Sequence, residues 1–122
     1  MRTKRFWFLL VLPLMVSWAL AQEAGEAAKI GYLIESVASL SGAAFIRNGT
    51  EYDARQAADH LRLKLRAAGD PVKTAEDFIR YCGSKSSVSG QPYRIRFSDG
   101  TSMTAEAFFR KQLKAYAAPK SP

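Results

Sequence analysis

The stretch that most constrains the fold is a helical pattern over residues 53–68. Its apolar residues recur every three or four positions and form one stripe, made of Ala54, Ala57, Ala58, Leu61, Leu65 and Ala68. Asp53 precedes the stripe as a helix N-cap, and Gln56 follows at the spacing of a capping box. Leu63 lies on the opposite side of the helical wheel, so one core cannot bury both sides. We therefore expect this helix in the middle of the domain, with the first or last helix covering Leu63; a binding partner is the alternative cover.

The first 21 residues have the pattern of a secretory signal peptide. Residues 2–5 are mostly basic, Phe6–Leu20 is an almost unbroken apolar run, and Ala19-Leu20-Ala21 supplies the small-x-small pattern of a cleavage site. The run is shorter than the roughly 20 residues that a membrane-spanning helix needs. We expect cleavage between Ala21 and Gln22; a retained membrane anchor is the alternative.

Cleavage there would leave 101 of the 122 residues, enough for a single domain over residues 22–118 with a flexible tail at 119–122. Removing Arg2, Lys4 and Arg5 from the 18 basic residues leaves 15 against 11 acidic ones, a net charge of +4. In an exported chain this charge does not indicate nucleic-acid binding, although it favours anionic surfaces slightly.

The remaining patterns predict three further helices, over residues 22–42, 74–82 and 104–116. The first of them carries a stripe of large aliphatic residues, namely Ile30, Leu33, Ile34, Val37 and Leu40. Two short strands are predicted, over residues 43–47 and 93–97, and Asp99-Gly100 marks a hairpin turn into residues 101–103. We expect an α+β fold, with about four helices around a small antiparallel sheet of two or three strands, in a single domain.

Cys82 is the only cysteine, so no disulfide can form within one chain. It follows Phe78 by one helical turn, which predicts that it is buried; an intermolecular disulfide or a reactive thiol is the alternative. One histidine and one cysteine make no cluster of zinc ligands, and the glycines are isolated in turns rather than gathered in a phosphate-binding loop. We expect no metal and no cofactor.

His60, the only histidine, lies at the flank of the apolar stripe. Asp59 is its neighbour in sequence and points about 100° away on a helix, so it cannot orient the ring as the acid of a hydrolase triad does. Ser86 and Ser87 lie in a serine-rich turn, where hydroxyl groups usually bond backbone groups. We expect His60 to be a packed side chain with one hydrogen bond; a catalytic histidine is the alternative.

Arginines and one loop supply the candidate binding surfaces. Arg94 and Arg96 share one face of their strand, and we expect Arg47 beside them if the two strands pair. The simpler interpretation is a solvated, charged face; the alternative is a site for an anionic glycan, a lipid phosphate or an acidic loop. The loop Ser84–Pro92 leads to Tyr93, which either packs in the core or stacks on a ligand. The candidate binding residues are Arg47, Asn48, Tyr52, His60, Ser86, Ser87, Tyr93, Arg94 and Arg96.

Four stretches, in this order, resemble the YfeK-like family of small exported bacterial proteins, which are built on a domain of unknown function. They are residues 45–49, 57–65, 74–79 and 86–93, and the resemblance extends over roughly residues 28–116. It implies one periplasmic domain. It brings no activity, so it assigns no catalytic residue.

These observations favour a non-catalytic binding or accessory module of the cell envelope. Its partner would be an envelope protein or an anionic cell-wall component, and not a nucleic acid. The cleaved chain would have no stable membrane span. One alternative is a small cell-wall hydrolase, or a hydrolase inhibitor, that uses His60 with Ser86 and Ser87. A self-associating structural protein is a third class, suggested by Leu63 and Cys82. The sequence assigns no oligomeric state.

Overall fold

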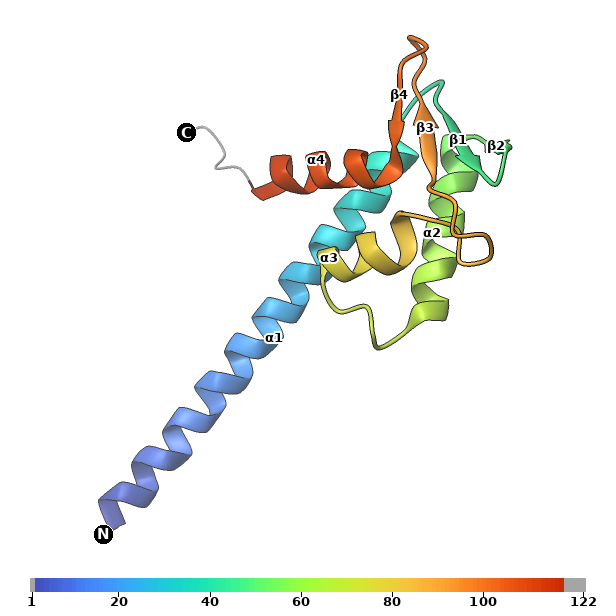
Figure 1. The fold of residues 1–122 in the computed structure, drawn as a ribbon. Helices are drawn as coiled ribbons and strands as arrows, with labels where there is room; N and C mark the ends of the chain where they lie inside the picture. The colour runs from blue at the N-terminus through green and yellow to red at the C-terminus, as the bar shows by residue number, and fades with distance from the viewer. Residues whose placement is uncertain (1, 118–122) are drawn as a thin grey trace, which may run out of the picture.

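Within residues 2–117, a four-stranded antiparallel sheet and four α-helices form one domain, which confirms the predicted α+β class (Figure 1). The computed structural model describes residues 2–117, and the side chains of residue 18 and residues 20–116. The helices cover one face of the sheet, where Phe45 and Ile95 are buried. The other face is open to solvent.

Helix α1, Arg2–Ala38, is one continuous helix whose N-terminal part projects away from the domain (Figure 1). Four residues of its predicted stripe, Ile30, Leu33, Ile34 and Val37, are buried as expected, whereas the fifth, Leu40, lies beyond the helix and is partly buried. The helix ends four residues before the predicted Gly42, in a turn that leads into the sheet. Within the described part of the chain, no helix offers an apolar stretch long enough to cross a membrane. The predicted tail, 119–122, lies outside the described residues.

The strands are β1 (Ala44–Arg47), β2 (Thr50–Tyr52), β3 (Arg94–Arg96) and β4 (Ser102–Thr104), in the spatial order β2-β1-β3-β4. The sheet therefore has one strand more than the predicted maximum. The additional strand is β2, which holds only three residues between the Asn48-Gly49 turn and the N-cap of the next helix. Asn48 and Gly49 both have positive φ, of 51° and 79°, as a two-residue hairpin turn requires.

Helix α2, Ala54–Ala68, begins at the predicted capping box: the Asp53 side chain accepts from the Gln56 amide, and the Gln56 side chain accepts from the Asp53 amide. Its predicted central position is wrong. Leu63 is 56% exposed, and no helix covers it. The stripe of α2 is mostly alanine and buries little volume, whereas α1 carries larger side chains and contacts α2, α3 and α4. The middle of the domain is therefore α1.

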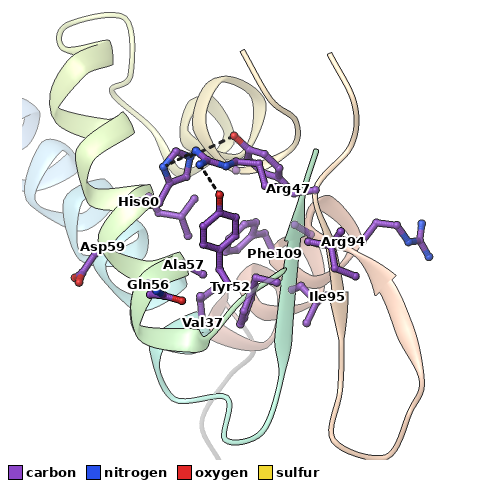
Figure 2. A pocket seen from close by; sticks show the side chains of 16 residues that line it. Val37, Arg47, Tyr52, Gln56, Ala57, Asp59, His60, Arg94, Ile95 and Phe109 are labelled. Carbon is purple, nitrogen blue, oxygen red and sulfur yellow. Dashed lines mark hydrogen bonds between the residues drawn. The ribbon is translucent and has the colours of Figure 1, made fainter. Parts of the chain in front are cut away.

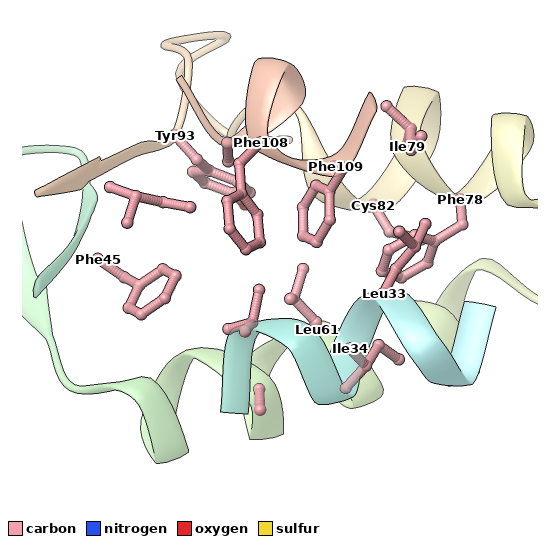
Figure 3. Close-up of a cluster of buried hydrophobic side chains, with 14 of the residues drawn as sticks. Leu33, Ile34, Phe45, Leu61, Phe78, Ile79, Cys82, Tyr93, Phe108 and Phe109 are labelled. Atoms are coloured by element: carbon pink, nitrogen blue, oxygen red, sulfur yellow. The ribbon is translucent and has the colours of Figure 1, made fainter. Parts of the chain in front are cut away.

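The remaining helices are α3 (Ala75–Phe78), the π-helical turn η1 (Ile79–Gly83) and α4 (Ala105–Ala117). Thr74 caps α3 in a second capping box, with Asp77. Side chains from α1, α3, η1 and α4 meet in the core, where the rings of Phe78 and Phe109 pack edge to face at 5.7 Å (Figure 3). Cys82 lies in this core with no exposed surface, which confirms the prediction of burial.

Candidate functional site

A pocket of about 320 Å³ lies between α2 and the inner face of the sheet (Figure 2). Pockets of this volume are at the lower end of the range for small-molecule sites, roughly 300–1,000 Å³. Apolar side chains from α1, β1, α2, β3 and α4 line it, namely Val37, Phe45, Ala57, Leu61, Ile95 and Phe109. An apolar molecule, or the apolar part of a larger one, fits such a lining.

Arg47 closes one end of the pocket. Its Nη2 donates to the Tyr52 hydroxyl at 2.9 Å, and its Nη1 lies 3.0 Å from both ring nitrogens of His60. Figure 2 shows the three side chains converging at that end. Because a guanidinium only donates, Nη1 can hydrogen-bond to only one of the two His60 nitrogens, the unprotonated one of a neutral imidazole. The guanidinium carbon also lies 4.9 Å from the centre of the Tyr52 ring.

Tyr93 joins the same end of the pocket, and Lys64 lies behind it. The Tyr93 hydroxyl accepts from Lys64 Nζ at 3.0 Å and lies 3.5 Å from His60 Nε2. Lys64 Nζ also donates to the Lys85 carbonyl, at 3.1 Å. We call Arg47, Tyr52, His60 and Tyr93 the polar rim of the pocket.

The polar rim is electropositive. Among the described residues, neither Arg47 nor Lys64 forms an ion pair with a carboxylate. Burial lowers the pKa of His60 below its ordinary 6.5, and the charges of Arg47 and Lys64 lower it further. The nearest acid in sequence, Asp59, pairs with Arg62 at 3.0 Å and points away from the pocket (Figure 2).

Close packing at Gly83 forms another part of the pocket wall. A Cβ on this residue would lie 2.8 Å from Cε2 of Phe109, so only glycine allows the ring its position. Gly83 is the last residue of η1, and both Gly83 and Phe109 line the pocket. The π-helical turn therefore forms part of the pocket wall. Short π-helical segments are frequent at functional sites.

The three predicted arginines do not share a face, and that prediction is wrong. In the observed register Phe45 lies opposite Ile95, and Ile46 lies opposite Arg94. Arg47 is two residues after Phe45 and points to the inner face, whereas Arg94 and Arg96 point to the outer one. Figure 2 shows the Arg94 guanidinium directed away from the pocket. Arg96 pairs with Glu51 on that outer face.

The serine loop is held by its own hydrogen bonds. Ser86 is 4% exposed, and its Oγ accepts from Asn48 Nδ2 and from the amides of Val88 and Ser89, at 3.1–3.3 Å. Ser89 also donates to Asn48. Ser87 is exposed in the same loop. Among the described residues no hydrogen bond joins Ser86 to His60, so the structure does not bring these candidates together.

The structure thus gathers Arg47, Tyr52, His60 and Tyr93 at one site and places Asn48 and Ser86 in a separate loop contact. Sequence reasoning missed Lys64 and Gly83. Lys64 follows His60 by four residues, a spacing that puts both on one side of α2 and could have indicated it. No local sequence pattern indicates that Gly83 lies against the Phe109 ring. In the described part of the chain, no group of three or more His, Cys, Asp or Glu residues could hold a metal ion.

Comparisons with known proteins match nearly the whole domain. A model described as a family of unknown function (DUF5329) matches residues 24–117. The Uncharacterized protein YfeK of Salmonella typhimurium is 39% identical over 85 residues, which are 70% of this chain and 68% of that protein. No solved structure matches the chain.

Proposed function

The chain belongs to the YfeK-like family of unknown function (DUF5329), and from that premise we propose that it is a non-catalytic periplasmic binding module that holds a small ligand in the pocket beneath the polar rim. One observation carries the proposal. An apolar pocket of about 320 Å³ ends at a partly buried arginine that no described carboxylate neutralises. Apolar pockets with a few convergent polar groups and a perturbed pKa are typical of binding sites.

Export to the periplasm is supported by the basic start, the apolar run and the Ala19-Leu20-Ala21 site. The placement of α1 agrees with cleavage after Ala21. Residues 21–25 are exposed, and among the described side chains Glu26 is the first that hydrogen-bonds another element, since it accepts from the Ala75 amide at 2.9 Å. A domain that begins at Gln22 would keep all these contacts.

A binding role fits the polar rim better than hydrolysis does. A triad needs a carboxylate to orient the histidine and a nucleophile to receive its help. His60 instead contacts Arg47 and Tyr93, and the buried Ser86 Oγ is occupied by Asn48 and two backbone amides. The rim can therefore bind and orient a ligand, while none of its groups is placed to attack one.

The proposal is tested by nuclear magnetic resonance of the ¹⁵N-labelled protein against small neutral, cationic and anionic apolar fragments. At least one class should shift the amide signals of pocket residues. Ala57→Phe, which fills the pocket, should abolish those shifts. Ala67→Phe places the same side chain on the exposed side of α2 and should leave them unchanged. If no class at millimolar concentration moves the pocket signals, the chain is not a small-molecule binding module.

A further inference from the structure

Resting on the proposed function, we infer that the ligand is an amphiphilic anion, with a carboxylate or phosphate head held by Arg47 and a single apolar chain in the pocket. Three features of the site point to such a ligand: the charge at the polar rim, the chemistry of the lining, and the size of the pocket. Each restricts a different part of the ligand.

The rim selects the head group. The guanidinium of Arg47 has five N–H groups, and its two Nη atoms contact only neutral partners, Tyr52 and His60. A partly buried cation without a counter-charge is costly, and an anion that docks on it removes that cost. Carboxylates and phosphates match the forked geometry of a guanidinium. Lys64, 3.0 Å from the Tyr93 hydroxyl, adds to the positive potential from behind.

The lining selects the other end of the ligand. The buried side chains of the lining are aliphatic or aromatic, with Val37, Phe45, Ile95 and Phe109 among them, whereas the polar lining residues Gln56 and Asp59 of α2 are exposed. A second charged group there would lose its hydration without gaining a partner. The ligand therefore carries its charge at one end only.

The volume limits the length of the chain. The pocket of about 320 Å³ is at the small end of the range for small-molecule sites, so a short single chain matches it. Octanoate, with eight carbons and two oxygens, is a short amphiphile of this kind. A cationic amphiphile of the same length would meet Arg47 and Lys64 with like charge, and a neutral one would leave the guanidinium without a counter-ion.

The test is isothermal titration calorimetry of the full protein, purified from its producing cells, with octanoate, octyl phosphate, octanol and octylamine. Octanoate or octyl phosphate should bind at least about tenfold more tightly than octanol, because hydrogen bonds to charged groups have that effect. Octylamine should bind most weakly. The preferred anion identifies the head group. Octanol or octylamine binding as tightly as both anions would overturn the inference.

Matched variants assign the effect to Arg47. Arg47→Gln should weaken octanoate binding about tenfold or more and leave octanol binding unchanged. Arg66→Gln removes the same charge from an exposed position on α2 and should leave the affinities for octanoate and octanol unchanged. Arg47→Lys keeps the charge without the fork, so it should retain part of the affinity if Arg47→Gln fails to fold. Unchanged octanoate affinity in both Arg47 variants overturns the inference.

A failure of this inference can be distinguished from a failure of the proposed pocket function. If octanol or octylamine binds best, and Ala57→Phe abolishes that binding, the pocket is a ligand site and only the anionic head is wrong. If none of the four compounds binds, both the inference and the proposed pocket function fail.

Discussion

Arg47 occupies an inward position of β1, where strand alternation would place an apolar residue after Phe45. Two neutral side chains contact its guanidinium: His60 on α2, and Tyr52 on β2 through both its hydroxyl and its ring. The inner face of the sheet is thereby divided into an apolar part over the core and a polar end. This division makes the pocket suitable for an amphiphile.

The stability of the protein should depend on pH through His60. Burial, Arg47 and Lys64 all lower the pKa of the folded imidazole, so the folded state takes up a proton less readily than the unfolded chain does. The stabilising contribution is complete above the ordinary value of 6.5 and is lost as the pH falls through 6.5 towards the lower folded pKa. Urea unfolding at pH 7.5 and 5.5 should therefore show a smaller free energy of unfolding at pH 5.5.

His60→Gln is the control for that measurement, because glutamine does not titrate. The difference in unfolding free energy between pH 7.5 and 5.5 should become smaller in this variant. The carboxyl groups whose pKa values are lowered, among them Glu26 and Asp77, titrate below this window and do not interfere. An identical pH dependence in both proteins would mean that another group is responsible.

At the scale of elements, η1 packs closely against α4 at Gly83. Gly83→Ala would bring a Cβ to 2.8 Å from Phe109, whose ring is fixed between Phe78 and Phe108 at 5.7 and 5.8 Å. We expect a loss of about 1–3 kcal/mol, as overpacked cores show, measured by chemical denaturation. Gly31→Ala is the matched control. Gly31 lies within α1 with no atom near its missing Cβ, so alanine should stabilise by roughly 0.4–1 kcal/mol. Equal effects at both sites would contradict the packing of Phe109 against η1.

The orientation of α2 predicts that two leucines only two residues apart contribute very differently to stability. Leu61 is 6% exposed and Leu63 is 56% exposed. Leu61→Ala should cost about 2–5 kcal/mol, as buried leucines do, whereas Leu63→Ala should change the free energy of unfolding by no more than about 0.5 kcal/mol. Thermal and urea unfolding of the two variants measure both values. A large loss at Leu63 would mean that the outer side of α2 is covered after all.

The elements could be predicted where local rules decide them. Asp53 and Thr74 begin helices because their side chains cap exposed amides, and Ile30 to Val37 follow the helical period. Strand β2 was missed because three residues next to an N-cap give almost no periodic signal. The close approach of Gly83 to Phe109 joins η1 to a helix that is distant in the sequence, so no local pattern contains it.

The candidate site was partly predictable. Arg47, Tyr52, His60 and Tyr93 were all identified as binding candidates, but Arg47 was grouped with Arg94 and Arg96 by residue type. Its true face follows from the pairing of Phe45 with Ile95, because a strand places alternate residues on one side. The pocket itself is a tertiary property: residues from seven elements form its wall, so sequence spacing alone could not locate it.

At the scale of the whole molecule, one helix, α1, belongs to two parts of the chain. Its C-terminal part packs in the domain, and its N-terminal part forms an extension. Trp18 is 70% exposed and Leu20 is 60% exposed, whereas buried residues begin at Ile30. Mass spectrometry of the protein recovered from cells should find Gln22 as the first residue. The processed protein should melt at the same temperature as the full chain, since Glu26 is the first described side chain that hydrogen-bonds another element. A membrane-bound species that still begins at Met1 would contradict export by cleavage.

The central claim is that the pocket ends in an electropositive, partly desolvated rim that receives an anion. Because His60 is the only histidine, its ring protons can be followed by nuclear magnetic resonance across pH without ambiguity. The account predicts a pKa below 6.5 in the free protein, and a higher pKa with octanoate bound, since a nearby negative charge favours the imidazolium. A free-protein pKa at or above 6.5 that octanoate leaves unchanged would contradict it.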